Sequence, residues 1–290
     1  MSTIKDVARL ANVSVATVSR VMNNSPKASA ASREVVQKAM AELGYTPNAN
    51  ARALVSQTCD TMGVLVGDVA DPFFGALVKG VAAVAVEQGL HLLMGNGFHK
   101  ARQERESIEL LIGKRCEALV VHSKALSDEE LIDYALRVPG MVLINRDIPA
   151  LKGRCIALNN RQGAATATRH LLELGHRHIA FLSSDHAIED AILRLQGYQD
   201  ALAEAGLRAD PELVESGMPN EEGGERAMLN LLAKGLPITA VVAYNDAMAA
   251  GAISVLADNG LKVPEEVSVV GFDDIIYARY LRPKLSTMRY

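Results

Sequence analysis

The feature that most constrains the fold is an alternation of short apolar runs with amphipathic stretches, which begins near Thr61. The apolar runs have the length of strands and occupy residues 62–66, 90–95, 118–122, 141–145, 156–158, 179–183, 240–244 and 267–272. Helical periodicity lies between most of them, at 77–88, 104–112, 163–174, 194–205, 222–232 and 248–259. Such a pattern is typical of parallel strands covered by helices on both faces. It predicts an α/β body of two doubly wound parallel-sheet subdomains, over residues 59–158 and 159–285.

The first 46 residues follow a different pattern, which predicts an all-α headpiece. Thr3 is placed to cap a helix that starts at Ile4, and Ser14 to cap a second helix over 15–22. Ser29 or Ser32 starts a third helix, which Gly44 ends. Two short helices joined by a tight turn and supported by a third indicate a helix-turn-helix unit.

The charge of the chain is unevenly distributed. Residues 1–58 carry a formal charge of +4, whereas the whole chain carries −4. A basic head on an acidic body favours a polyanionic partner for the head.

The second helix of the headpiece has the chemistry of a DNA reader. We expect its apolar positions Val13, Val18, Val21 and Met22 to face inward, leaving Val15, Ala16, Ser19 and Arg20 outward. Small apolar groups suit thymine methyls, and the Arg20 guanidinium suits guanine O6 and N7. Hydroxyl groups of Ser14, Thr17 and Ser19 can position phosphates. A small three-helix bundle that binds protein is the alternative from these residues alone.

Polar residues follow several of the predicted strands, where ligands of doubly wound sheets bind. These are Asn145, Asn245-Asp246 and Asp273-Asp274, with Arg194 expected to begin a helix beyond Ser183. Amides, carboxylates and a guanidinium suit the vicinal hydroxyls of a neutral ligand, and Phe73 or Phe74 could stack on a sugar ring. Helix capping is the alternative for Asp246 and Asp274, and a core position is the alternative for one Phe. The Asp273-Asp274 pair lacks an evident third metal ligand.

Other classes of protein find little support. The sequence contains no Walker A motif, no GxGxxG after a strand and no nucleophile elbow, so we expect no catalytic residue, no metal and no cofactor. No run of roughly 18 apolar residues occurs, which excludes a membrane span. MSTIKDVARLA lacks the apolar block of a secretory signal, and three Cys without metal spacing suit a reducing compartment. We therefore expect a cytoplasmic protein that is not an enzyme.

Long motifs give the chain a specific resemblance. TIKDVARLANVSVATVSRVMNNSPKASAASREVVQKAMAELGYTPNANARAL resembles the headpiece of the lactose/galactose repressor family of bacterial transcription regulators. GDVADPFFGALVK, VVHSKAL, GMVLINR and YNDAMAAGA are similar to the galactose branch of that family, which implies a body like the periplasmic sugar-binding proteins.

The resemblance implies a DNA-binding dimer with a hinge. Residues 47–58 are Ala-rich and could form a short helix, marginal alone in water, or a flexible linker. In the family this hinge pairs with that of a second copy in the minor groove, where a leucine at the position of Leu54 opens a base step. The residues that we expect to contact DNA are Thr3, Ser14, Val15, Ala16, Thr17, Ser19, Arg20, Asn23, Asn48, Ala51 and Leu54.

The resemblance also implies an effector and a function. Effector contacts are expected at Phe73, His122, Asn145, Arg194, Asn245 and Asp273, with D-galactose as inducer. The expected protein is a homodimeric repressor of galactose transport and metabolism genes, released from a pseudo-palindromic operator by D-galactose. The alternatives are a repressor of this fold that senses another sugar or a purine corepressor, and a cytosolic sugar-binding protein without DNA function. Residues 286–290, with the sequence STMRY, are expected to start the crossover back to the first subdomain, where the chains of the family continue further.

Overall fold

The computed structural model describes residues 2–23, 25–45 and 60–289, and the chain divides into two compact units after Cys59. The predicted hinge 47–58, with Asn48, Ala51 and Leu54, lies outside the described residues. No helix within the described ranges is long and apolar enough to cross a membrane.

The first unit contains, over its described residues, the helices α1 (Ile4–Leu10), α2 (Val15–Met22) and α3 (Ala30–Glu42). Each begins after a hydroxyl residue whose side chain accepts a hydrogen bond from the N–H three positions later, namely Thr3, Ser14 and Ser29. Ser29, and not Ser32, is therefore the cap of α3. The helices pack around a small core of Val7, Val18, Val21, Val36 and Ala39, so the predicted inward face of α2 is confirmed.

The second unit begins with a five-stranded parallel sheet, which with its helices we call the first half. Its elements are β1 (Thr61–Val66), α5 (Pro72–Glu87), β2 (His91–Asn96), α6 (Ala101–Gly113), β3 (Ala118–Val121), α7 (Asp128–Arg137), β4 (Gly140–Ile144), a 3-10 turn (Pro149–Leu151) and β5 (Cys155–Ile156). The strand order is β2-β1-β3-β4-β5. All neighbouring strands of this sheet are parallel.

The second half repeats this arrangement. It comprises α8 (Asn160–Glu173), β6 (Ile179–Ser184), α9 (Glu189–Glu204), a 3-10 turn (Pro211–Leu213), β7 (Val214–Gly217), α10 (Glu221–Ala233), β8 (Ala240–Ala243), α11 (Asp246–Asp258), β9 (Ser268–Phe272), α12 (Ile276–Tyr280) and β10 (Ser286–Met288). Its parallel strands have the order β7-β6-β8-β9-β10, which is the order of the first sheet read in the same direction. The predicted fold class, an all-α headpiece with a doubly wound α/β body, is confirmed.

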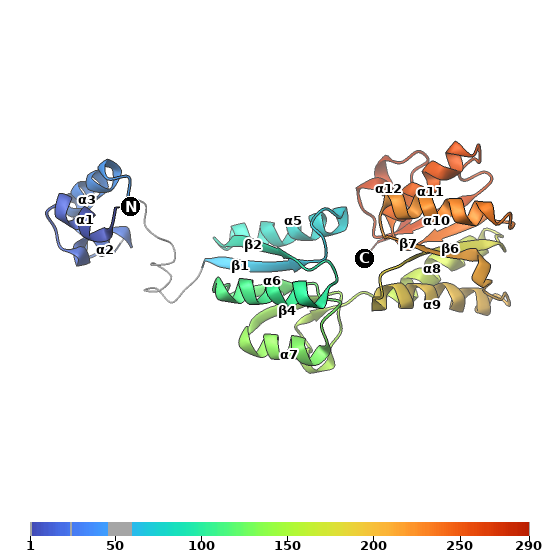
Figure 1. Ribbon diagram of the computed structural model, residues 1–290, viewed down its shortest axis with the longest axis horizontal. Helices are drawn as coiled ribbons and strands as arrows, with labels where there is room; N and C mark the ends of the chain where they lie inside the picture. Colours follow the sequence, from blue (N-terminus) through green and yellow to red (C-terminus); the bar gives the residue numbers. More distant parts are fainter. Residues whose placement is uncertain (1, 24, 46–59, 290) are drawn as a thin grey trace. The chain divides into compact units, whose positions relative to one another are not determined.

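Helices cover both faces of each sheet (Figure 1). In the second half, α8 and α9 lie against one face around Phe181 and Tyr198, and α10 and α11 lie against the other around Met228 and Met248. The α8–α9 contact is close because Gly197 has no side chain: a Cβ there would lie 2.1 Å from the carbonyl oxygen of Arg161. This packing fixes the start of α9, where the site residues of that helix lie.

Ser286–Met288 form β10, which pairs with β9 of the second sheet, and a crossover to the first subdomain that starts within residues 286–290 stays a prediction. The structure differs from the sequence predictions in two places. The edge strand β7 was not predicted, since VESG offers a single large apolar residue. Arg194 does not begin a helix, because α9 starts five residues earlier at Glu189.

Candidate effector site and DNA-reading helix

The ends of several strands from both halves surround one cavity. Its volume is about 470 Å³, which includes solvent space at its open side. All six residues that were predicted to contact an effector line it, together with nine that were not named for that role: Asp71, Phe74, Leu158, His99, His186, Ile188, Asp190, Pro219 and Tyr244. His122, Asn145 and Asp273 each directly follow a strand, as the strand-end argument requires. The structure thus brings the predicted set together; its contact with an effector stays a prediction.

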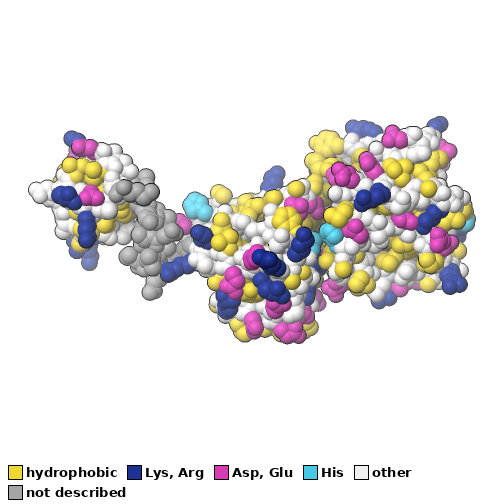
Figure 2. Space-filling model, viewed as in Figure 1, with side chains coloured by type: hydrophobic (Ala, Val, Ile, Leu, Met, Phe, Trp, Pro, Cys, Tyr) yellow, Lys and Arg dark blue, Asp and Glu magenta, His cyan; other side chains and the backbone are white. Residues whose placement is uncertain are grey.

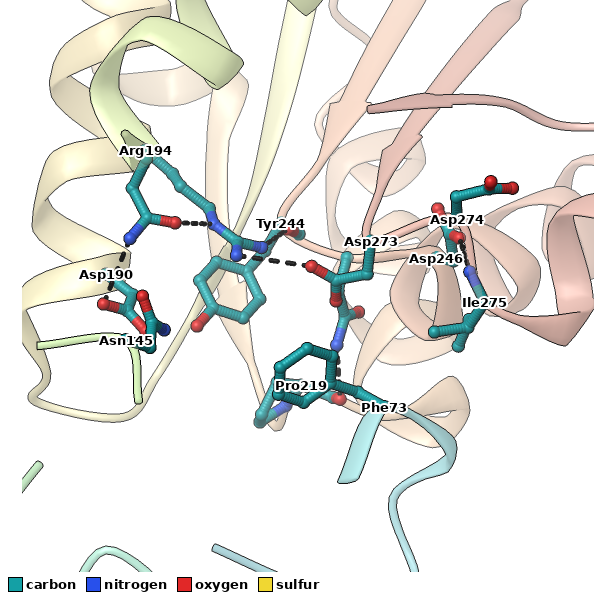
Figure 3. A network of polar contacts seen from close by, with 12 residues as sticks. Phe73, Asn145, Asp190, Arg194, Pro219, Tyr244, Asp246, Asp273, Asp274 and Ile275 are labelled. Carbon is teal, nitrogen blue, oxygen red and sulfur yellow. Dashed lines mark hydrogen bonds and ion pairs between the residues drawn. The ribbon is translucent and has the colours of Figure 1, made fainter. Parts of the chain in front are cut away.

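Arg194 is the centre of the polar network in the second half (Figure 3). Its side chain is 5% exposed. Its Nε donates to Asn160 Oδ1 (2.9 Å), its Nη1 to the carbonyl oxygen of Tyr244 (2.5 Å) and its Nη2 to Asp273 Oδ1 (3.3 Å). The guanidinium also lies over the ring of Phe272, 3.7 Å from its centroid. These contacts hold the guanidinium plane in one orientation beside the cavity.

Asp190, in the first turn of α9, connects the second half to the first. Its carboxylate accepts hydrogen bonds from Lys124 Nζ (2.7 Å) and Asn145 Nδ2 (2.6 Å) of the first half, and from Asn160 Nδ2 (3.2 Å). Lys124 Nζ also donates to the carbonyl oxygen of Asn145. The Lys124 side chain is 1% exposed, so this ion pair is shielded from water and from salt.

Asp246 does not cap the following helix, as the sequence suggested, because its neighbour Asn245 has that role. Asn245, with an extended backbone, is the N-cap of α11, and its Oδ1 accepts from the N–H of Met248 (2.9 Å). Asp246 is already helical, and its carboxylate accepts from the N–H of Ile275 (2.8 Å) and from Thr287 Oγ1 (2.5 Å). Asp274 caps no helix either, because the N-cap of α12 is Ile275. Asp246 therefore ties α11 to β10 and to the segment that follows β9.

Burial sets the electrostatics of the cavity. It raises the pKa of Asp273 to about 7, against the opposing attraction of the Arg194 guanidinium. It also raises the pKa of Asp71, which caps α5 by accepting from the N–H of Phe73 (2.8 Å). Burial lowers the pKa of His99, and lowers that of His122 well below its ordinary value. Burial therefore disfavours the charged forms of these four lining groups, which suits a neutral ligand better than an anion.

Aromatic rings form one wall of the cavity. Phe74 is buried and Phe73 is half-buried, so the prediction that one Phe belongs to the core is confirmed. Their ring centroids are 4.9 Å apart in an edge-to-face arrangement. Phe74 also contacts the ring of His122, at 4.8 Å between centroids. Phe73 lines the cavity, and its contact with a ligand stays a prediction.

Two kinds of lining residue escaped the sequence analysis. His99 and His186 lie in the loops after β2 and β6, and applying the strand-end argument to every strand would have found them. Asp190 carries no such signal, since an acid in the first turn of a helix is ordinary. Within the described residues, no group of three or more His, Cys, Asp or Glu side chains could hold a metal ion.

In the first unit, α2 presents the predicted DNA-contacting face to solvent. Val15, Ala16 and Arg20 are exposed, and Arg20 forms no ion pair with any described residue. Ser14 Oγ accepts from the N–H of Thr17 (3.1 Å) and lies 2.9 Å from the Thr17 hydroxyl. Lys and Arg side chains outnumber acidic ones on the face of this unit seen in Figure 2.

The remaining described members of the DNA set lie on α2 or at the ends of the first two helices. Thr3 is exposed at the start of α1, where its hydroxyl bonds to the Asp6 carboxylate at 2.7 Å. Ser19 is half-buried on α2, and Asn23 is exposed at its C-cap. All three residues therefore lie within or beside α1 and α2, the helices of the predicted helix-turn-helix.

A helix-turn-helix unit joined to a two-sheet body with a polar cavity defines the class: a DNA-binding transcriptional regulator. Comparison with known proteins agrees. Residues 3–48 match the family of bacterial regulatory proteins described as lacI, and residues 168–290 match a periplasmic binding protein-like domain. The chain belongs to the lacI family of bacterial regulatory proteins.

Individual relatives support this assignment over the whole chain. It is 59% identical over all 290 residues to the HTH-type transcriptional regulator GalR of Escherichia coli K12, of which it covers 84%, and 54% identical to GalS of Salmonella typhimurium LT2, of which it covers 85%. A solved structure of the lac repressor dimer bound to operator and the anti-inducer ONPF is 28% identical, with a TM-score of 0.82 over 100% of this chain and 87% of that one. These relatives are named as transcriptional regulators and not as enzymes, in agreement with the sequence prediction.

Proposed function

We propose that this protein is a homodimeric repressor of galactose transport and metabolism genes, which binds a pseudo-palindromic operator and is released by D-galactose. The observation that carries the proposal is the convergence of all six predicted effector residues on one cavity between the halves. The 59% identity of the chain to GalR supports D-galactose as the effector.

The DNA-binding part of the proposal rests on α2. Val15 and Ala16 contact thymine methyls in the major groove, and Arg20 pairs with a guanine. Thr3, Ser14, Thr17, Ser19 and Asn23 position the unit on phosphates. Asn48, Ala51 and Leu54, outside the described residues, complete the set, with Leu54 entering the minor groove between two copies.

The sugar-binding part rests on the chemistry of the lining. A galactose ring has hydroxyl groups on its edge and an apolar face of C–H groups. Arg194 and Asp273 offer charged partners to neighbouring hydroxyls, Asn145 and Asn245 offer amides, and His122 offers an imidazole. Phe73 packs on the apolar face of the ring, as aromatic side chains do at sugar sites.

Release of the operator requires that the sugar distinguish two states of the second unit. Residues from both halves line the cavity, so a sugar that contacts both favours the closed arrangement. By this proposal the closed state positions the first units wrongly for the two half-sites. A useful switch needs a coupling free energy of about 1–3 kcal/mol.

The experiment is fluorescence anisotropy of a labelled galactose-type operator, titrated with protein over a salt series, with and without D-galactose. We expect affinity that falls steeply with salt, because phosphate contacts release counterions, and that falls further with D-galactose. Arg20→Ala should cost about 1–3 kcal/mol and relax the preference at one base position. The control is Arg177→Ala, at a surface position of the second half. Operator binding that ignores D-galactose would contradict the proposed effector.

A repressor that responds to another polyol is the second candidate. The observation in its favour is that a differently named regulator, the HTH-type transcriptional repressor CytR of Escherichia coli K12, is 36% identical over 99% of this chain. A panel of D-galactose, D-glucose, D-fucose and adenosine in the same assay separates the candidates. If D-galactose releases the operator at the lowest concentration of the four compounds, the result supports the proposal. If another compound releases it at a lower concentration, that compound is the effector instead.

A further inference from the structure

Three histidines meet at the cavity, and the predicted effector set includes one of them. His99 comes from the loop after β2, His122 from the end of β3 and His186 from the loop after β6. The ring centroids of His99 and His122 are 5.7 Å apart, and those of His99 and His186 are 5.2 Å apart. Because His186 belongs to the second half, the pair His99–His186 spans the boundary between the halves. Figure 2 shows histidine side chains, in cyan, at this boundary.

These rings have unused hydrogen-bonding capacity. The Nδ1 atoms of His99, His122 and His186 are buried and have no hydrogen-bond partner among the described residues. A buried polar atom without a partner is destabilising, so such atoms are rare in folded proteins unless something else satisfies them. Three of them at one cavity point to a polar ligand there.

The surrounding residues make room for the ring of His99. A Cβ at Gly67, just beyond the end of β1, would lie 2.8 Å from both Cε1 and Nε2 of His99. Phe74 supports the ring from another side, with centroids 6.4 Å apart. Any side chain at position 67 would therefore displace the imidazole. The local sequence leaves His99 facing the cavity.

The rings are suited to hydroxyl groups and not to an anion. Burial lowers the pKa of His99 and of His122, so both imidazoles are neutral near pH 7. A neutral imidazole has one donor and one acceptor nitrogen, and a hydroxyl group can pair with either. His186, Glu104, Asp190 and Lys124 are the titratable groups that act electrostatically on His99, and Lys124 and Asp190 are already paired with each other.

We propose that His99 and His186 are specificity-determining residues, which hydrogen-bond through Nδ1 to hydroxyl groups of the sugar from opposite halves of the unit. The proposal rests on the proposed function and deepens it. It makes the sugar a bridge between the two loops, so the same contacts that select the ligand also favour the closed arrangement. It adds two residues to the six predicted from the sequence.

The test is isothermal titration of the full chain with D-galactose and its 2-, 3-, 4- and 6-deoxy analogues. His99→Leu and His186→Leu remove both ring nitrogens, whereas His99→Asn and His186→Asn keep a polar atom near the position of Nδ1. We expect each Leu variant to bind D-galactose roughly 3- to 10-fold more weakly, the value of one neutral hydrogen bond. We expect the Asn variants to recover most of this loss. Each Leu variant should also stop distinguishing D-galactose from one particular deoxy analogue.

The control variant is His170→Leu, at an exposed position on α8, which should leave every affinity unchanged. Operator binding without sugar reports that each variant is folded. Equal losses in Leu and Asn variants, with all deoxy analogues affected alike, would show that the histidines only shape the cavity and would overturn the proposal, as would unchanged affinities. A wild-type chain that binds none of the sugars would overturn the proposed effector itself, which is a separate result.

Discussion

The two halves of the second unit have the same strand order but prepare their cavity walls differently. In the second half, Arg194 is held by hydrogen bonds to Asn160, the Tyr244 carbonyl and Asp273. In the first half, His99 and His122 present buried ring nitrogens that no described residue pairs with. The Arg194 side of the cavity is therefore preorganised, whereas the side formed by His99 and His122, with His186 of the second half beside them, keeps ring nitrogens without a partner among the described residues. Repetition of a topology does not repeat the chemistry built on it.

The substitution with the largest expected effect removes the Arg194 side chain from the preorganised side of the cavity. Arg194→Ala leaves the buried Asp273 carboxylate without its cation, and we expect the stability of the second unit to fall by roughly 3–5 kcal/mol. Galactose binding should be lost, whereas operator binding at 25 °C should be kept. Urea unfolding and operator anisotropy check this. A fully stable variant would show that the wall does not depend on Arg194.

The next effect is on the pH dependence of stability, which should have opposite signs for a buried group in each half. Burial raises the pKa of Asp246 to about 6 from an ordinary 3.8, so the folded chain binds this proton more tightly than the unfolded chain. The resulting stability is present below about pH 4 and is lost as the pH rises through about 6. Asp246→Asn has no such proton. The stability of the wild type relative to the variant should therefore fall between pH 4 and 7, by up to about 3 kcal/mol.

The first half should give the opposite slope. Burial lowers the pKa of His99, so its contribution to stability is present above the unfolded value of 6.5 and is lost as the pH falls through the folded pKa. Urea titrations of the wild type, Asp246→Asn and His99→Leu at several pH values measure both. If the stability differences between wild type and each variant changed with pH in the same direction, the predicted electrostatic contrast between the halves would be wrong.

A smaller effect weakens the contact that joins the two walls. Lys124→Met removes the hydrogen bonds from Nζ to Asp190 and to the Asn145 carbonyl, while Asp190 keeps two amide partners. We expect galactose affinity to fall by about 2 kcal/mol, the value of a hydrogen bond to a charged group. Lys152→Met, at an exposed position of the first half, is the matched control. Equal affinities in titration calorimetry would show that this ion pair does not support closure.

The smallest effect concerns the aromatic contact to the sugar. Phe73→Ala should weaken galactose binding by about 1 kcal/mol, because the ring packs on the sugar's apolar face. Tyr280→Ala, with 71% of the residue exposed, serves as the control. The same calorimetric titration measures both variants. An unchanged affinity for Phe73→Ala would assign the ring to packing against Phe74 alone.

Sequence patterns predicted much of this molecule because its determinants are local. Caps such as Thr3 and Ser14, and the glycines that end helices, act within one turn of chain. Asn145 and Asp273 were found because the ends of parallel strands share one edge of a sheet. Residues that act across long separations were missed or misassigned: Asp190 contacts Asn145 from 45 positions away, and Asp246 accepts from Ile275. Those partners depend on how the sheets and helices pack, which no local pattern records.

In the proposed function, sugar binding and operator binding to the same protein weaken each other. The most direct test is D-galactose affinity by titration calorimetry, with and without saturating operator. Linkage requires operator to weaken galactose binding by the same factor by which galactose weakens operator binding. We expect a factor of roughly 5 to 150, equal in both directions. A galactose affinity that is the same with and without operator would contradict the account.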